Sequence, residues 1–327
     1  MKKILAKYLN FFVVCNLFSC SFLGEDTVNI PPQKSRIAIF AELFNDEELD
    51  QLVILSRTRN LNEPIVWSTA KGDTIFNQNG GYTINFIDFD SVLGAKIKLT
   101  SDNKDVAIFV QVDPFYKSVY GSKIERLETG SNCKLQVSAP DFDTVFAEQI
   151  VPKSVKLVKA YFKRNSFKSL QTGTLSELFL EFDNDPSAIN YYAADVFVRQ
   201  TNRSDYYYTE AKLIKLDQNA DTPKFLSSKN FNTKRYVWRI GIDIDNDYNL
   251  AIDGIRNKPI PNNIINLAVR FRSTSKDFNE YAKNLEAVKS AKDNLFGEPI
   301  TPFTNIKNGY GVFIVSGKAD TMSVSLR

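Results

Sequence analysis

Alternating apolar and polar positions dominate the first half of the sequence and predict β-strands. Residues 37–43 place Ile, Ile, Ala and Leu at every second position, and residues 95–100 alternate Ala, Ile and Leu with Lys, Lys and Thr. A two-residue period is typical of a strand with one buried face. Turn-forming Asn, Asp, Gly and Ser separate such segments, for example at residues 79–81 and 101–103. Several short strands at this spacing predict a sandwich.

The second half of the sequence contains longer strands of the same kind. Residues 236–244 and residues 267–271 each place large apolar side chains on one face. Pro152 lies between the two sets of segments and marks the expected domain boundary. We therefore predict a mainly β fold with two β-sandwich-like domains. The first, at residues 35–152, is immunoglobulin-like or prealbumin-like, and residues 153–327 form a larger β domain.

One helix near residues 277–292 interrupts the strands of the second domain. Its apolar residues recur at steps of three and four, as in the stripe of an amphipathic helix: Phe278, Tyr281, Leu285 and Val288. Asp277 followed by Glu280 resembles an N-terminal capping box. We expect this helix to cover a sheet face, because amphipathic helices usually pack internally. A helix that binds a partner protein is the alternative.

Residues 1–19 have the parts of a secretory signal peptide. A basic start precedes an apolar stretch that is shorter than the roughly 20 residues of a membrane-spanning helix. The stretch ends in Leu-Phe-Ser-Cys at residues 17–20, which resembles the lipobox of bacterial lipoproteins. Cleavage between Ser19 and Cys20 would leave the Cys20 sulfur tied to a diacylglyceryl group. Residues 20–34 would then be a lipidated tether; a buried N-terminal strand or helix is the alternative.

The residues after Cys20 indicate the membrane to which the anchor would attach. Ser21 stands where an Asp retains lipoproteins in the inner membrane, so the sequence favours the outer membrane. Glu25 and Asp26 loosely resemble the acidic surface-export tag of Bacteroidota lipoproteins, which favours exposure on the cell surface. A diacylglyceryl group together with an N-acyl chain such as palmitate would make the attachment stable.

Composition excludes several classes of function. The sequence has no His, which removes Ser-His-Asp and Cys-His catalysis and His-ligated zinc or haem. Of its three Cys, Cys133 alone would stay a free thiol after processing, and its alternating surroundings predict a buried strand residue. Lys2, Lys3 and Lys7 account for the formal net charge of +3. The mature chain is therefore neutral, and nucleic-acid binding is not expected.

No catalytic constellation emerges from the remaining residue types. We therefore expect a protein that is not an enzyme and that needs no cofactor. Carboxylate-only chemistry stays open as a third possibility, since a glycosidase needs only two acids roughly 5 to 9.5 Å apart.

An acidic segment after the strand at residues 236–244 is a candidate metal site. Asp243, Asp245 and Asp247 place oxygen ligands at alternate positions, which suits calcium. The EF-hand pattern fails, because Tyr248 occupies the required Gly position. An acidic turn is the alternative interpretation.

A glycine-containing segment near the end of the chain is a candidate partner contact. It consists of Asn308, Gly309, Tyr310 and Gly311, and it lacks the spacing of a phosphate-binding loop. Either these residues form a turn that leads into a strand, or they contact a receptor. We favour the turn, because glycines there have a backbone reason to be present.

Several groups of residues in this sequence are similar to a known family. They lie at residues 37–43, 53–57 and 93–97, then at residues 185–186 and 190–192, and finally at residues 294–299 and 305–313. The last two groups read Asn-Leu-Phe-Gly-Glu-Pro and Asn-Ile-Lys-Asn-Gly-Tyr-Gly-Val-Phe, with Leu295 where the family commonly has Pro. On these residues the whole chain resembles the Bacteroidota lipoproteins catalogued as domain of unknown function 4249 (DUF4249).

The resemblance implies a function that the residue patterns do not. Members of this family look like outer-membrane lipoproteins and are often encoded beside TonB-dependent receptors. It therefore implies a non-enzymatic accessory or binding subunit of a TonB-dependent nutrient-uptake receptor, anchored to the outer membrane through Cys20. A surface adhesion or structural module is the alternative.

Overall fold

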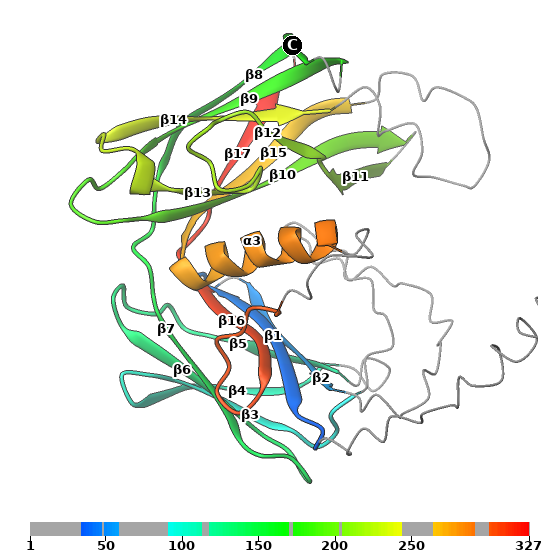
Figure 1. Ribbon diagram of the computed structural model, residues 1–327, viewed down its shortest axis with the longest axis vertical. Helices are drawn as coiled ribbons and strands as arrows, with labels where there is room; N and C mark the ends of the chain where they lie inside the picture. The colour runs from blue at the N-terminus through cyan, green and yellow to red at the C-terminus, as the bar shows by residue number, and fades with distance from the viewer. Residues whose placement is uncertain are drawn as a thin grey trace, which may run out of the picture. The chain divides into compact units, whose positions relative to one another are not determined.

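The computed structural model describes residues 34–47, 49–58, 91–112, 118–169, 173–202, 205–243, 264–291 and 301–326. Strands dominate these residues, which confirms the mainly β prediction (Figure 1). One group of strands builds an eight-stranded sheet: β1 (Ile37–Phe44), β2 (Asp50–Arg57), β3 (Lys96–Ser101), β4 (Lys104–Gln111), β5 (Val119–Lys123), β6 (Asn132–Ser138), β7 (Val145–Ile150) and β16 (Tyr310–Ser316).

The remaining strands form two further sheets. The five-stranded sheet contains β10 (Tyr191–Asn202), β11 (Asp205–Glu210), β13 (Phe225–Ser227), β15 (Ile264–Thr274) and β17 (Asp320–Ser325). The four-stranded sheet contains β8 (Leu157–Ser169), β9 (Gly173–Asp183), β12 (Leu213–Lys215) and β14 (Arg235–Ile242). The described helices are a short 3₁₀ helix, η1 (Ser228–Asn230), and the α-helix α3 (Lys276–Ala291).

The eight-stranded sheet has the order β16-β1-β2-β5-β4-β3-β6-β7, and its two edges nearly meet. Phe146 in β7 exchanges backbone hydrogen bonds of 3.2 and 2.8 Å with Lys307, which lies just before β16. We expected two facing sheets in the first domain. The strands instead form one sheet that curls on itself and buries its inward-facing side chains in a single core.

β16 joins this sheet from far along the sequence. It pairs in parallel with β1, with Ile39 opposite Gly311 and Leu43 opposite Val315, so segments near both ends of the chain lie side by side (Figure 1). We predicted that residues 310–316 belong to the second domain, together with the rest of residues 153–327. Their backbone instead completes the sheet of the first domain.

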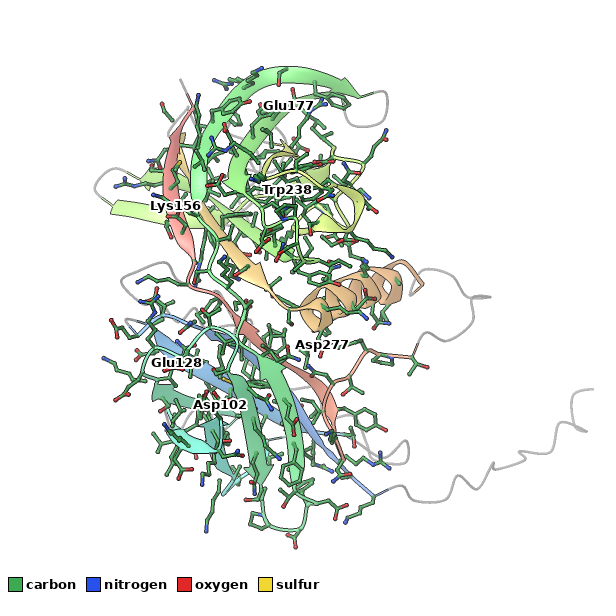
Figure 2. All side chains as sticks on the ribbon, turned by 90° about the vertical axis from the view of Figure 1, so that its left-hand side faces the viewer. Asp102, Glu128, Lys156, Glu177, Trp238 and Asp277 are labelled. Atoms are coloured by element: carbon green, nitrogen blue, oxygen red, sulfur yellow. The ribbon has the colours of Figure 1, made fainter. Side chains whose placement is uncertain are left out.

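The other two sheets face each other as a sandwich. Their inward side chains form one core, in which Trp238 of β14, Phe182 of β9 and Phe271 of β15 are fully buried. Figure 2 labels Trp238 among these strands. Phe182 packs against Phe271 with ring centroids 4.8 Å apart. The predicted apolar faces of residues 236–244 and 267–271 are thus confirmed up to Ile242; Ile244, the last apolar residue of the first segment, lies outside the described residues.

α3 begins and ends within one residue of the predicted helix and covers a sheet face, as expected. Its buried face carries Phe278 and Ala282, which pack against Val312 and Ile314 on the outer face of β16. Leu285, which the predicted stripe placed on the buried face, is exposed. The contact with β16 therefore uses only the first half of the predicted stripe.

Candidate functional site

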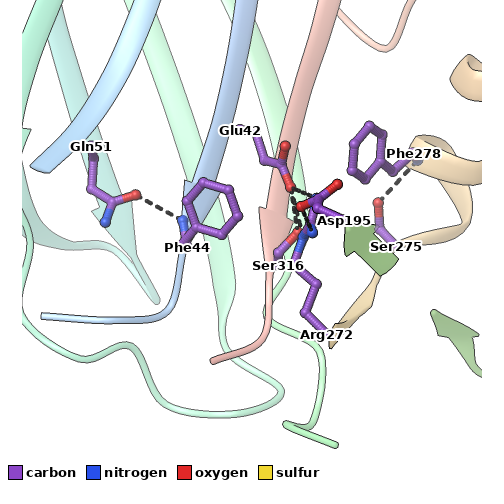
Figure 3. Close-up of polar contacts among 8 residues, drawn as sticks. All are labelled: Glu42, Phe44, Gln51, Asp195, Arg272, Ser275, Phe278 and Ser316. Atoms are coloured by element: carbon purple, nitrogen blue, oxygen red, sulfur yellow. Dashed lines mark hydrogen bonds and ion pairs between the residues drawn. The ribbon is translucent and has the colours of Figure 1, made fainter. Parts of the chain in front are cut away.

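A buried ion cluster links the curled sheet to the sandwich (Figure 3). At its centre, Arg272 of β15 has a side chain only 3% exposed. Its Nε and Nη2 donate hydrogen bonds to Oε1 of Glu42 in β1, at 3.0 and 2.8 Å, and its Nη1 donates to Asp195 in β10. Ser316 of β16 donates from Oγ to the same Glu42 oxygen at 3.0 Å. Four strands that are far apart in the sequence therefore meet at one guanidinium.

Aromatic rings complete the surroundings of this cluster. The Arg272 guanidinium carbon lies 5.3 Å from the ring centroid of Phe44 and 5.9 Å from that of Phe278, within the range of cation–π attraction. Buried Gln51 fixes the end of β1, because its Oε1 accepts a 2.7 Å hydrogen bond from the Phe44 backbone amide (Figure 3). No local sequence pattern predicted this cluster.

The start of α3 is a second polar junction. Ser275, not Asp277, is the residue that caps the helix: its Oγ accepts from the Phe278 amide at 3.3 Å, and its carbonyl accepts from the Asn279 amide. Asp277 instead accepts from Nε2 of Gln149 at 2.6 Å and from Nδ2 of Asn305 at 3.0 Å. The predicted capping box is therefore wrong, because Asp277 is used to tie α3 to β7 and to the segment before β16.

An open cleft of about 810 Å³ lies beside this junction, and we call it the junction cleft. Its walls come from the start of β6, the end of β7, the starts of β10 and α3, and the end of β15. Amide and carboxylate side chains line it, together with the aromatic ring of Tyr191: Asp102, Asn132, Glu148, Gln149, Asn190 and Asp277. Figure 2 labels Asp102 on the curled sheet and Asp277 at the start of α3.

Two hydroxyls at the junction cleft have no hydrogen-bond partner among the described residues. They are Ser273 Oγ and Thr274 Oγ1, and both residues line the cleft although they are 5% and 4% exposed. A buried hydroxyl without a partner is destabilising, so these groups favour a bound water or a polar ligand. The cleft can thus hydrogen-bond a polar molecule, with amides and carboxylates offering both donors and acceptors.

The residues at 185–192 that carry the family resemblance form one hydrogen-bonded turn next to this cleft. Nδ2 of Asn190 donates to the carbonyl of Asp185 at 2.7 Å, and the Tyr192 hydroxyl donates to Oδ1 of Asn184 at 2.7 Å. Hydrogen bonds from Ser187 lower the pKa of the Asp185 carboxyl, whereas burial raises the pKa of the Tyr192 phenol. Both shifts move the pKa further from neutrality, so Asp185 stays a carboxylate and Tyr192 stays a neutral phenol that can donate its hydrogen bond.

The candidate partner contact at residues 308–311 leads into β16. A Cβ on Gly311, which has a φ of +97°, would lie 1.9 Å from the Ile39 carbonyl oxygen, and a Cβ on Gly309 would lie 2.6 Å from that of Ile37. Glycine at both positions lets β16 approach β1, which supports the turn-and-strand interpretation. The Tyr310 side chain is exposed, with the Arg36 guanidinium carbon 5.7 Å from its ring centroid. Asn308 donates from Nδ2 to the Thr144 carbonyl at 3.3 Å.

The other predicted sites are described only in part. Asp243 is buried at the end of β14, where its amide donates to the Lys212 carbonyl, whereas Asp245 and Asp247 lie outside the described residues, so the calcium site stays a prediction. Ser19 and Cys20 also lie outside them. In the described part of the chain, no group of three or more Cys, Asp or Glu side chains could hold a metal ion.

Cys133 agrees with its prediction as a buried strand residue. Cys133 in β6 is a fully buried free thiol, as predicted, and burial raises the pKa of this thiol. None of the described helices is long and apolar enough to cross a membrane.

Comparison with known proteins places the chain in a family. A search of curated proteins finds no match. Residues 27–321 match the family described as "Domain of unknown function (DUF4249)", which covers most of the chain and includes all eight strands of the curled sheet. The chain therefore belongs to the DUF4249 family.

Proposed function

We propose that this protein is an outer-membrane lipoprotein that serves as a non-enzymatic accessory or binding subunit of a TonB-dependent nutrient-uptake receptor. The single observation that carries the anchoring is Leu-Phe-Ser-Cys at residues 17–20, after a basic and then apolar leader. The receptor as partner rests on the resemblance of the chain to lipoproteins that are encoded beside such receptors.

The geometry of the described residues favours binding over catalysis. The carboxylates of the ion cluster are both bound to Arg272, and buried Glu177 accepts hydrogen bonds from Arg239 and Ser166. Carboxylates held in this way are poor candidates for the two acids of a glycosidase, which must face a bound sugar. The junction cleft, with its open walls and paired donors and acceptors, suits recognition of a polar molecule or chain segment.

A surface adhesion or structural module is the second candidate. It is favoured by the role of the residues that mark the family, since these stabilise the fold itself. Asn305, for example, donates to the Phe313 carbonyl and accepts from the Phe313 amide, at 2.8 and 2.9 Å. A side chain that binds its own backbone in this way has a structural reason to be there without any receptor.

The test is purification of the lipoprotein from detergent-extracted membranes, with Cys20→Ala as the unlipidated variant. Cys15→Ala is the matched control, because it removes a cysteine of the leader that the lipobox does not use. We expect a stoichiometric TonB-dependent receptor with the wild type and with Cys15→Ala, and none with Cys20→Ala.

Two other results would change the proposal. A protein recovered alone from the outer membrane, and cleaved by protease on whole cells, would favour the adhesion or structural module. An N-terminal peptide that carries no lipid mass in the wild type would exclude anchoring through Cys20.

A further inference from the structure

The outer face of β4 carries a row of exposed aliphatic side chains, which we call the β4 patch: Ile108, Val110 and Val112. They are 68%, 64% and 51% exposed, at every second position of the strand and its end. Phe109, between the first two, points into the core and is 2% exposed. The patch therefore follows from the strand period, but its outward side chains are apolar where solvent would favour polar ones.

The β4 patch lies on the outer face of the curled sheet, between residues of β3 and β5. Lys98 of β3 lies opposite Ile108, and Gly121 of β5 lies opposite Val110. A Cβ on Gly121 would lie 2.8 Å from Cγ2 of Val112, so the glycine leaves room for the valine. Lys96 and Lys98 border the patch on β3, where Lys98 pairs with Asp105 at 2.7 Å.

Strand directions place the patch toward the end of the sheet where the described chain begins. β1 is antiparallel to β2, β2 to β5, and β5 to β4, so β4 runs opposite to β1. The last residues of β4 consequently lie at the end of the sheet where β1 starts, three residues after Lys34. Exposed Leu93, just before β3, lies at the same end.

The length of chain between Cys20 and Lys34 limits how far this end of the sheet can lie from a lipid on Cys20. A chain of that length with random-coil statistics would span about 20 Å on average. The β4 patch, from Ile108 to Val112, is about 13 Å long at the rise of a strand. A lipid on Cys20 would thus hold this end of the sheet within reach of the bilayer that contains the lipid.

We propose that the β4 patch rests on the surface of the lipid bilayer that anchors the protein. This inference rests on the lipid anchor of the proposed function. Its aliphatic side chains enter the boundary between headgroups and acyl chains, and Lys96 and Lys98 contact lipid phosphates, as at other interfacial protein surfaces. The patch orients the protein, while the lipid on Cys20 supplies most of the attachment.

The test measures the depth of a label on the full chain. Val110→Cys carries an environment-sensitive fluorophore, and native Cys133 does not compete because it is fully buried. Val237→Cys is the matched control, an exposed valine at the centre of β14 in the sandwich. Lipidated protein is reconstituted on vesicles of phosphatidylethanolamine with phosphatidylglycerol as the anionic component. We expect lipid-borne nitroxide to quench the label at residue 110 but not at 237, and aqueous iodide to do the reverse.

Equal quenching by iodide at both positions, on lipidated protein that floats with the vesicles, would overturn the patch and leave the anchor intact. If the wild-type chain does not float, the anchor fails. A chain that begins at Ser21, without the leader, its Cys15 or the lipid, is then mixed with excess vesicles and decides the patch: shielding of the label at residue 110 supports it, and free access of iodide overturns it. In that arm, Ile108→Ser is expected to lower vesicle binding about tenfold. The proposal would also be overturned if the label at residue 110 were shielded from iodide only after a receptor protein is added, and not by lipid alone.

Discussion

The outer faces of β16 and β4 belong to the same curled sheet but have opposite surroundings. Val312 and Ile314 on β16 are 0% exposed, because α3 covers them with Phe278 and Ala282. Among the residues that the structure describes, no helix covers the aliphatic side chains of the β4 patch, which are 51–68% exposed. Both strands carry apolar residues on their inner and their outer faces. The local sequence therefore does not tell whether the outer face of a strand is covered by another part of the chain or is exposed.

The two faces differ in the polar contacts that surround them. On the β16 side, α3 is held by a cap at Ser275 and by Asp277, and the neighbouring β1 reaches Arg272 through Glu42. These polar contacts join segments that are far apart in sequence, and they fix α3 over the sheet. On the β4 side, the described residues place the exposed ion pair of Lys98 with Asp105 beside the patch, and exposed pairs contribute little.

Removal of the guanidinium at the centre of the ion cluster should have the largest effect. Arg272→Met leaves Glu42 and Asp195, whose side chains are 13% and 17% exposed, as largely desolvated carboxylates without their cation, and breaking a buried pair in this way costs up to about 3–5 kcal/mol of unfolding free energy. Urea titration monitored by tryptophan fluorescence measures the loss. Arg235→Met is the control, because that arginine pairs with Asp183 on an exposed surface, and it should change stability little. Equal losses in both variants would mean that the cluster does not hold the covered side together.

Truncation on the two faces tests the comparison directly. Ile314→Ala removes a fully buried side chain beneath α3 and should cost about 2–5 kcal/mol. Ile108→Ala makes the same chemical change on β4 and should alter stability by less than about 0.5 kcal/mol. The two variants are compared by urea titration under identical conditions. A large loss for Ile108→Ala would show that the β4 patch is covered in solution, and the mass of the particle in solution would then identify a second copy.

Loss of the helix cap should have a smaller effect. Ser275→Ala removes the hydroxyl that accepts from the Phe278 amide and should cost about 1 kcal/mol. Glu280→Ala is the control, since Glu280 makes an exposed pair with Lys283 and should cost no more than a few tenths of a kcal/mol. Thermal unfolding followed by circular dichroism ranks the two. A larger loss of stability for Glu280→Ala than for Ser275→Ala would instead support the capping box predicted at Asp277 and Glu280.

The strands were predictable because their signal is local. Ile37, Ile39, Ala41 and Leu43 alternate with more polar neighbours, and burial follows that alternation in β1. The helix was predictable for the same reason, although its cap was not. Ser275 and Asp277 are both good capping residues. Ser275 caps the helix because the Asp277 carboxylate accepts hydrogen bonds from Gln149 and Asn305, which lie in distant segments.

The ion cluster and the position of β16 were not predictable from local patterns. Arg272 follows buried Phe271, at the position where a strand normally presents a polar side chain to water. Nothing near it in the sequence indicates Glu42, which lies at the other end of the chain. Gly309 and Gly311 did signal a close backbone approach, but they do not say which strand approaches; pairing with β1 is a property of the whole fold.

The smallest effect is expected at the uncovered start of β16. Tyr310 lies opposite Ala38 on the outer face, with Arg36 over its ring, and an exposed cation–π pair contributes about 0.5–1 kcal/mol. A double-mutant cycle of Arg36→Ala and Tyr310→Leu should return a coupling of that size. Because the fold requires the flanking glycines, Tyr310 is the side chain of the Asn308–Gly311 segment whose identity the fold constrains least. If Tyr310→Leu abolishes receptor co-purification at nearly unchanged stability, this residue contacts the receptor; if co-purification persists, the segment serves the fold alone.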